Sequence, residues 1–222
     1  MPPSKFIIAA VDGSAASGKS STSRAVAERL NLLHVDSGAH YRAVTLLYLK
    51  SQRESGNAES IADYLTRIPV DVALVGRNAR IRLNNYLPTG EELRAPEVTA
   101  MVSHFAAMPK VRNVLLEYQR GHEQTAREKG FAGMIMEGRD IGTVVFPHAD
   151  FKFFLSAAPG KRAERRAREG LEDSIAKRDK MDSGRKVAPL ACASDAIRID
   201  SSYLSLEAVV NKVCAIIEGR DA

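Results

Sequence analysis

Eight residues near the N-terminus, Gly13-Ser-Ala-Ala-Ser-Gly-Lys-Ser20, match the pattern G-x-x-x-x-G-K-[ST] of a phosphate-binding loop. An apolar run at residues 6–11 precedes the loop and helical spacing follows it, which is the strand-loop-helix context that the motif requires. The glycines allow backbone N–H groups to turn inward around phosphate oxygens, and the helix N-terminus adds positive potential. The loop therefore predicts a binding site for a nucleoside triphosphate.

Individual residues of the loop have distinct expected roles. Lys19 is expected to reach the β- and γ-phosphates, and the hydroxyl of Ser20 is expected to ligate Mg²⁺. Asp36 and Glu137, each at the end of a predicted strand, are alternative candidates for holding magnesium-bound waters, and the sequence does not choose between them. A GTPase switch would need a guanine-reading N-K-x-D motif, which the chain lacks. The predicted ATP-binding residues of the loop are Gly13, Ser14, Ala15, Ala16, Ser17, Gly18, Lys19, Ser20 and Ser21.

Apolar strands alternate with helices along the chain, which predicts an α/β fold with a five-stranded parallel sheet and helices on both faces. Polar clusters follow four of these strands, so ligands are expected at the carboxyl ends of the sheet. The alternating residues 70–83 predict a β-hairpin insertion that stands apart from the main sheet. Residues 111–129 are expected to form one helix. The five core strands are predicted at residues 6–11, 34–35, 134–136, 151–155 and 196–199.

Arginines gather near the predicted strand ends and on one predicted helix. Guanidinium groups suit a phosphate dianion, and several of them would offset its repulsion with a γ-phosphate. A nucleic-acid-binding module would instead interleave basic residues with aromatics along one surface, and few aromatics lie near these arginines. The chain therefore predicts a phosphorylated small acceptor rather than nucleic acid. The strand-end arginines are Arg42, Arg139, Arg178 and Arg185; the helical ones are Arg162, Arg165, Arg166 and Arg168.

Composition is that of an ordinary globular protein, with 45% apolar and 27% charged residues and a net charge of +5. Its two cysteines, Cys192 and Cys214, have no metal-ligand or redox spacing, which is typical of a reducing compartment. The apolar stretch near the N-terminus is too short for a signal peptide or a membrane span. We therefore expect a cytoplasmic monomer that does not bind membranes.

Taken together, these motifs resemble those of bacterial cytidylate kinases over nearly the whole chain. The resemblance rests on residues 12–20, 36–42, 109–112, 137–147, 178–185 and 187–190, and Glu137-Gly-Arg-Asp-Ile-Gly-Thr143 is its most specific segment. It implies a P-loop kinase that uses ATP and Mg²⁺ to phosphorylate CMP and dCMP. It also implies a single domain, residues 1–222, with a nucleoside monophosphate (NMP)-binding insertion at about 39–100 and a short lid at about 160–186. Kinases of UMP, dephospho-coenzyme A or shikimate remain alternatives.

The resemblance also assigns roles by matching positions. Cytosine offers an amino donor beside two acceptors, so a carboxylate and a guanidinium suit its edge. The chain departs from the family pattern at three places. His40 stands where the family has an apolar residue, and we expect it to be a neutral packing residue. Ala16 replaces a common loop glycine, and the lid is shorter than is usual in the family. The implied base-reading residues are Ser103, Arg112 and Asp140; the phosphate-binding residues are Ser37, Arg42, Arg139 and Arg178; the ribose-binding residues are Asp182 and Arg185; the lid residues on ATP are Arg162 and Arg166; and the catalytic residues are Lys19, Arg139 and Arg178.

Overall fold

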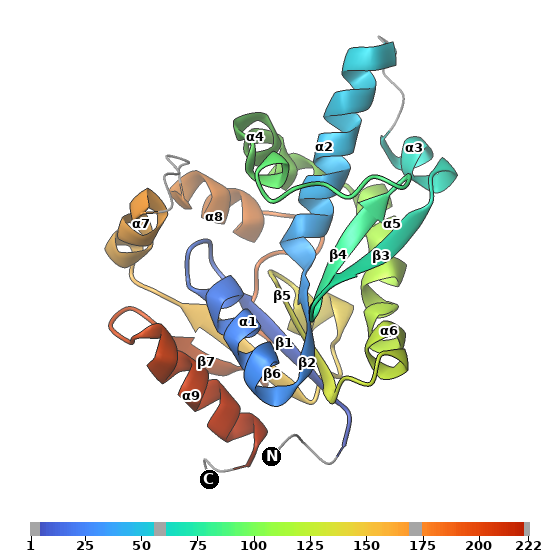
Figure 1. Ribbon diagram of the computed structural model, residues 1–222. Coiled ribbons are helices and arrows are strands. Elements are labelled where there is room, and N and C mark those ends of the chain that lie inside the picture. The colour runs from blue at the N-terminus through green and yellow to red at the C-terminus, as the bar shows by residue number, and fades with distance from the viewer. Residues whose placement is uncertain (1–4, 56–60, 169–174, 220–222) are drawn as a thin grey trace.

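The computed structural model describes residues 5–55, 61–168 and 175–219. They form one seven-stranded sheet with helices around it (Figure 1). All neighbouring strands are parallel except β3 and β4, which form an antiparallel hairpin. The strand order across the sheet is β3-β4-β2-β5-β1-β6-β7. The strands are β1 (Ile7–Gly13), β2 (Leu32–Asp36), β3 (Val70–Val75), β4 (Asn78–Leu83), β5 (Gly133–Gly138), β6 (Phe151–Ser156) and β7 (Ile197–Asp200).

The hairpin β3–β4 corrects the expectation of a five-stranded sheet with a separate β insertion. β4 pairs in parallel with β2, where His34 lies opposite Asn78 and Val35 opposite Ala79. Ala79, Ile81 and Leu83 are buried on one face of β4, so the hairpin must cover part of the core. Pairing also satisfies the backbone groups along the edge of β2, which would otherwise be unpaired. The prediction of a hairpin is therefore confirmed, and the prediction that it stands apart from the main sheet is wrong.

Helices cover both faces of the sheet, as the sequence predicts. On one face, α1 (Lys19–Leu30) and α9 (Leu206–Ile217) pack against a core that includes Phe153 of β6. On the other face, α5 (Pro109–Arg120) and α6 (His122–Glu128) pack against a core that includes Met134 of β5. The single helix expected at residues 111–129 is wrong: it is divided at Gly121, a residue type that is unfavourable within helices.

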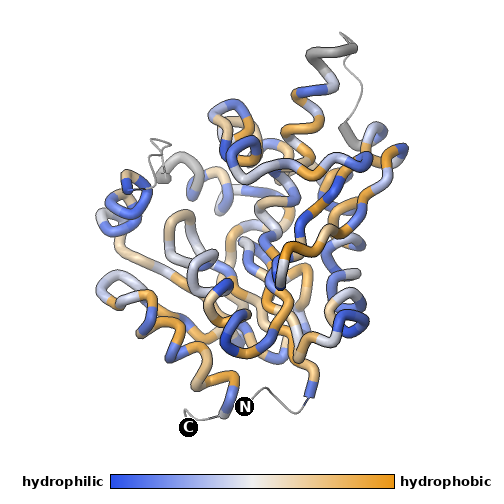
Figure 2. Tube along the Cα trace, viewed as in Figure 1, coloured by the Kyte–Doolittle hydropathy of each residue, from blue (hydrophilic) through white to orange (hydrophobic). Residues whose placement is uncertain are grey.

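Two groups of helices rise beyond the carboxyl ends of the strands (Figure 1). One group includes α2 (Ser37–Ser55) and α4 (Pro96–Phe105), which share an apolar core with the hairpin and α5. The other comprises α7 (Pro159–Arg168) and α8 (Ile175–Ser183); α7 buries no residue and is hydrophilic in Figure 2. The remaining helices are α3 (Ile61–Arg67), a 3-10 helix η1 (Glu92–Arg94) and a π-helix η2 (Ile141–Val145).

His40 lies inside the protein, on α2, and is fully buried. Its ring stacks on that of His122, with centroids 5.3 Å apart, and meets the edge of Tyr118. Burial, and the nearby His122 ring, hold the pKa of His40 well below its usual value. His40 is therefore a neutral packing residue, as expected. Within the described ranges, no helix combines the length and apolar character needed to cross a bilayer.

Candidate active site

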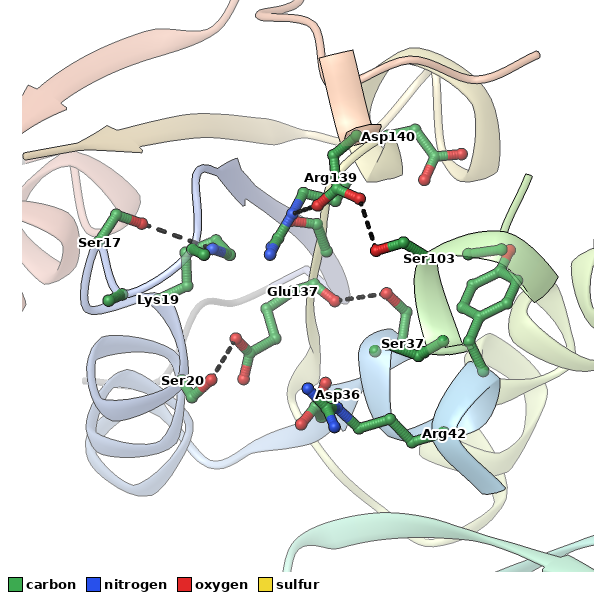
Figure 3. Close-up of a pocket in the computed structure, with 18 of the residues that line it drawn as sticks. Ser17, Lys19, Ser20, Asp36, Ser37, Arg42, Ser103, Glu137, Arg139 and Asp140 are labelled. Atoms are coloured by element: carbon green, nitrogen blue, oxygen red, sulfur yellow. Dashed lines mark hydrogen bonds and ion pairs between the residues drawn. The ribbon is translucent and has the colours of Figure 1, made fainter. Parts of the chain in front are cut away.

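A cavity of about 530 Å³ opens at the carboxyl ends of the central parallel strands (Figure 3). The phosphate loop after β1 forms one wall, and the strand ends at Asp36 and Glu137 form the floor. Residues of α2, α4 and α8 complete the opposite side. The site therefore lies where the strand-end clusters predict it.

The backbone of the phosphate loop is fixed by close packing and by unusual torsion angles. A Cβ atom on Gly13 would lie 2.0 Å from the carbonyl oxygen of Leu155, so only glycine fits between β1 and β6. Gly18 has a φ of 91°, which glycine adopts without strain. Ala16 has a φ of 56° in the left-handed region, which costs a non-glycine residue roughly 1–2 kcal/mol. The loop thus keeps the expected shape although Ala16 replaces a glycine.

Lys19 contacts its own loop. Its Nζ donates a hydrogen bond to the Ser14 carbonyl oxygen at 2.7 Å and another to Ser17 Oγ at 3.4 Å. Burial, together with the positive charge of Arg139, lowers the pKa of Lys19 to about 7. The nearby carboxylates Glu137, Asp12 and Asp36 oppose this lowering but do not cancel it, so Lys19 is a buried group whose charged form a phosphate would stabilise.

Ser20 contacts one carboxylate that could help to hold a cation. The Ser20 hydroxyl donates to Glu137 Oε2 at 2.7 Å, while Glu137 Oε1 lies 3.1 Å from His34 Nε2. Burial and the charge of Glu137 raise the pKa of Asp36, which also lines the cavity. A hydroxyl and two carboxylates fit the oxygen preference of Mg²⁺, and a cation would relieve the repulsion between the carboxylates. Of the two candidates that the sequence leaves open, Glu137 is the one that contacts Ser20.

Asp182 of α8 joins several predicted acceptor-binding residues. Its Oδ2 accepts a hydrogen bond from Arg139 Nε at 2.8 Å, and its Oδ1 accepts from Arg185 Nη2 at 2.5 Å and from Ser103 Oγ at 3.4 Å. The Asp182 side chain is only 3% exposed. One buried carboxylate thus holds two guanidiniums at the cavity wall, next to the strand end at Glu137.

Arg112 and Asp140 form a buried ion pair. Arg112 Nη2 contacts Asp140 Oδ2, and Arg112 Nη1 also donates to the Ala106 carbonyl oxygen at 3.0 Å. Asp140 lines the cavity, whereas Arg112 lies behind it, with its guanidinium 5.5 Å from the Tyr41 ring centroid. Burial raises the pKa of Asp140 although Arg112 opposes the shift. The structure therefore brings the predicted carboxylate and guanidinium together, with only the carboxylate facing the cavity.

Ser37 and Arg42 also line the cavity from the start of α2. The Ser37 hydroxyl donates to the Glu137 carbonyl oxygen at 2.7 Å, which ties α2 to the end of β5. Arg42 Nη1 donates to the Leu93 carbonyl oxygen and to Thr99 Oγ1, both at 2.9 Å. Both side chains are thus held in place beside the cavity (Figure 3).

The arginines of α7 differ in where they point. Arg166 lines the cavity. Arg162 contacts Asp179 Oδ2 through Nη1 and donates to the Ala157 carbonyl oxygen at 3.0 Å through Nε. Arg165 instead binds Ser201 on the loop after β7, at 3.0 Å to its Oγ. The predicted residue Arg178 belongs to α8, but its side chain lies outside the described residues.

Comparison with known proteins identifies the family of the chain. A protein-family model described as cytidylate kinase matches residues 9–219. The chain belongs to the cytidylate kinase family. A cytidylate kinase of Streptomyces griseus is 40% identical over 221 residues, which cover 96% of this chain and 94% of that protein. One from Desulforamulus reducens is 41% identical over 220 residues, covering 94% and 96%, and one from Clostridium tetani is 38% identical over 223 residues, covering 96% and 94%.

Several residues of this family member reach the site without having been predicted from the sequence. Arg24, Tyr41 and Arg94 line the cavity. Asp179 of α8 accepts a hydrogen bond from the backbone N–H of Ala15 at 3.2 Å. Arg24 follows the phosphate loop by one helical turn, and Tyr41 directly precedes Arg42. Their positions next to these motifs could have predicted that both residues reach the cavity. Arg94 and Asp179 come near only through tertiary packing.

Proposed function

We propose that this protein transfers the γ-phosphoryl group of ATP to CMP and dCMP, giving ADP and CDP or dCDP. The observation that carries the proposal is one continuous cavity with two different phosphate-binding sides. The phosphate loop and Lys19 form the donor side, and Arg42 and Arg139 lie on the acceptor side. Two nucleotides placed in such a cavity meet with their phosphates facing each other. Membership of the cytidylate kinase family supports the choice of acceptor.

Positioning and electrostatic stabilisation account for the chemistry. Backbone amides of the loop and Lys19 bind the donor phosphates, and the guanidiniums offset the charge of the acceptor phosphate. The attacking oxygen belongs to an anionic phosphate, so no general base is needed. A magnesium ion held at Ser20 with Glu137 would neutralise charge on the donor phosphates. Arg166, which lines the cavity, and Arg178, which the family resemblance assigns a catalytic role, would stabilise the phosphoryl group during transfer.

Asp140 is proposed to read the base. Its carboxylate accepts a hydrogen bond from the N4 amino group of cytosine, whereas uracil would present its O4 oxygen and leave an unpaired polar contact. Ser103 lies on the same side of the cavity. Arg112 holds Asp140 in place through their ion pair. For the Nη2 group of Arg112 to donate a hydrogen bond to the base, this ion pair would have to break. Sites of this kind reject an analogue that lacks the matching group by about 10⁴-fold or more.

A coupled assay of ADP formation with CMP, dCMP, UMP and AMP tests the proposal. We expect CMP and dCMP to be used with kcat/KM values far above those of UMP and AMP. Equal kcat/KM values for CMP and UMP would contradict the role of Asp140. Absence of ADP formation with every acceptor would contradict the proposed activity itself.

Binding of ATP is expected to take up a proton above neutral pH. The pKa of Lys19 is about 7 because the group is buried, so most of the population is uncharged at pH 8. Bound phosphates favour the ammonium form and raise this pKa, so ATP binding at pH 8 should take up close to one proton. Calorimetry in two buffers of different ionisation enthalpy measures the uptake. A proton uptake near zero at pH 8 would contradict the expectation that Lys19 becomes protonated when ATP binds.

Asp179 competes with ATP for its partners, so Asp179→Asn is expected to strengthen ATP binding. The carboxylate accepts from the Ala15 N–H and pairs with Arg162, two groups that we assign to the donor phosphates. Removing its charge should lower the Kd for ATP by roughly tenfold, the size of one charged hydrogen bond. Nucleotide titration measures this change, with Asp195→Asn as the control because Asp195 pairs with Lys152 away from the cavity. Weaker ATP binding would show instead that Asp179 orients Arg162 for phosphate.

A further inference from the structure

Asp12, the residue before the phosphate loop, binds a segment on the acceptor side. Its Oδ1 accepts a hydrogen bond from the backbone N–H of Ile141 at 2.9 Å, and its Oδ2 accepts from that of Gly142 at 2.7 Å. The Asp12 side chain is buried, and so are both amide donors. Asp12 is therefore not a solvated loop carboxylate, because each oxygen has a defined backbone partner.

These two amides begin the π-helix η2, which directly follows Asp140. The first N–H groups of a helix have no partner within the helix and need one from elsewhere. Asp140 precedes η2 but provides no side-chain cap, and its carboxylate contacts Arg112 instead. Asp12 supplies the missing cap from β1, and a carboxylate is favoured at that helix end.

The capped segment carries the residues proposed to bind the acceptor. Arg139 and Asp140 lie between the end of β5 and the start of η2. β5 is fixed by pairing with β1 and β2, and Asp12 fixes the other end of the turn. The turn itself has little space: a Cβ atom on Gly138 would lie 2.5 Å from Ser37 Oγ. Small changes at the cap should therefore displace Arg139 and Asp140 together.

We propose that Asp12 is a positioning residue for acceptor recognition, holding the turn that presents Arg139 and Asp140 to the CMP base and phosphate. This inference rests on the proposed function of the cavity. It adds that the strand leading into the donor loop also sets the geometry of the acceptor side. Asp12 touches neither nucleotide in this arrangement and acts through the Ile141 and Gly142 amides.

The test is Asp12→Asn, which preserves shape but leaves only one acceptor oxygen for two N–H donors. We expect the KM for CMP to rise by at least about tenfold, the size of one lost charged hydrogen bond, with a smaller preference for CMP over UMP. The KM for ATP should change by less than about twofold if the loop backbone is retained. Asp150→Asn is the matched control, because Asp150 accepts from the Ile8 N–H at 2.8 Å at the opposite end of β1. Unchanged CMP kinetics, or equal weakening of CMP and ATP, would overturn the proposal.

A second measurement needs no variant. Burial raises the pKa of Asp12 to about 6, with Asp140 and Lys19 as the nearby charged groups. The amide ¹H and ¹⁵N shifts of Ile141 and Gly142 in the wild type should therefore move together with a midpoint near pH 6. Different titration midpoints for the Ile141 and Gly142 amides would overturn the capping contact even if the Asp12 variant fails to fold, because one carboxyl group cannot titrate two amides differently. Failure of wild-type CMP phosphorylation would instead contradict the proposed function, and the amide titration would still decide the contact.

Discussion

Lys19→Met is expected to lower kcat for phosphoryl transfer from ATP to CMP by about 10²–10³-fold. Methionine keeps the length of the side chain but removes the charge that would meet the β- and γ-phosphates, and a single preorganised charged donor contributes about 10²–10³-fold. Lys19 is buried, and among the described residues that line the cavity it is the only lysine, so none of them replaces its charge. A coupled assay at saturating CMP measures the loss.

Lys212→Met is the matched control, because Lys212 is exposed on α9, away from the cavity. Circular dichroism should show that both variants are folded. CMP binding, measured by calorimetry without ATP, should be retained in Lys19→Met. Wild-type turnover in Lys19→Met would remove the basis for treating the phosphate loop as the donor site.

Asp140→Ala is expected to lower kcat/KM for CMP by about 10²-fold while leaving ATP binding nearly unchanged. The variant loses a charged hydrogen bond to the base and leaves the buried Arg112 without its carboxylate, a combined cost of about 2–3 kcal/mol. Steady-state kinetics with CMP and UMP measure both the loss and the change in preference.

A conservative variant separates base reading from folding. Asp140→Asn keeps the volume of the side chain and offers an amide donor. The ratio of kcat/KM for CMP to that for UMP should therefore fall, while the melting temperature should change little. Asp63→Ala, at an exposed position on α3, serves as the control. Retention of the full preference for CMP in Asp140→Asn would show that another group reads the base.

Sequence patterns predicted the strand, loop and helix around the phosphate-loop motif, because these elements depend on a local motif. The chain from Ile7 to Leu30 forms strand, loop and helix in immediate succession, and the glycines at 13 and 18 adopt backbone angles or close contacts that only glycine tolerates. The strand-end rule then placed Asp36 and Glu137 in the same cavity. These features depend on residues that are close in sequence or on sheet topology.

Contacts between distant segments were not predictable in the same way. β4 alternates like any half-buried strand, and its pairing with β2 depends on an edge that only the folded sheet presents. Arg112 and Asp140 were both assigned to the base, but their ion pair depends on how α5 packs against the turn after β5. Asp12 and Asp179 look like ordinary carboxylates beside a motif, and only their backbone partners reveal what they bind.

The stacked histidines His40 and His122 make the folded protein sensitive to acid. Burial lowers the pKa of His122 to about 4 and that of His40 well below 6.5, so the unfolded chain takes up protons first as the pH falls. Stability is therefore complete above about pH 6.5 and falls progressively toward pH 4; His122 alone accounts for about 3 kcal/mol of that loss. Denaturant titrations at pH 7 and pH 5 should show the decline, and His40→Leu should reduce its slope. Mild acidification would thus destabilise the wild-type protein through a pair of buried rings that lies outside the residues lining the cavity.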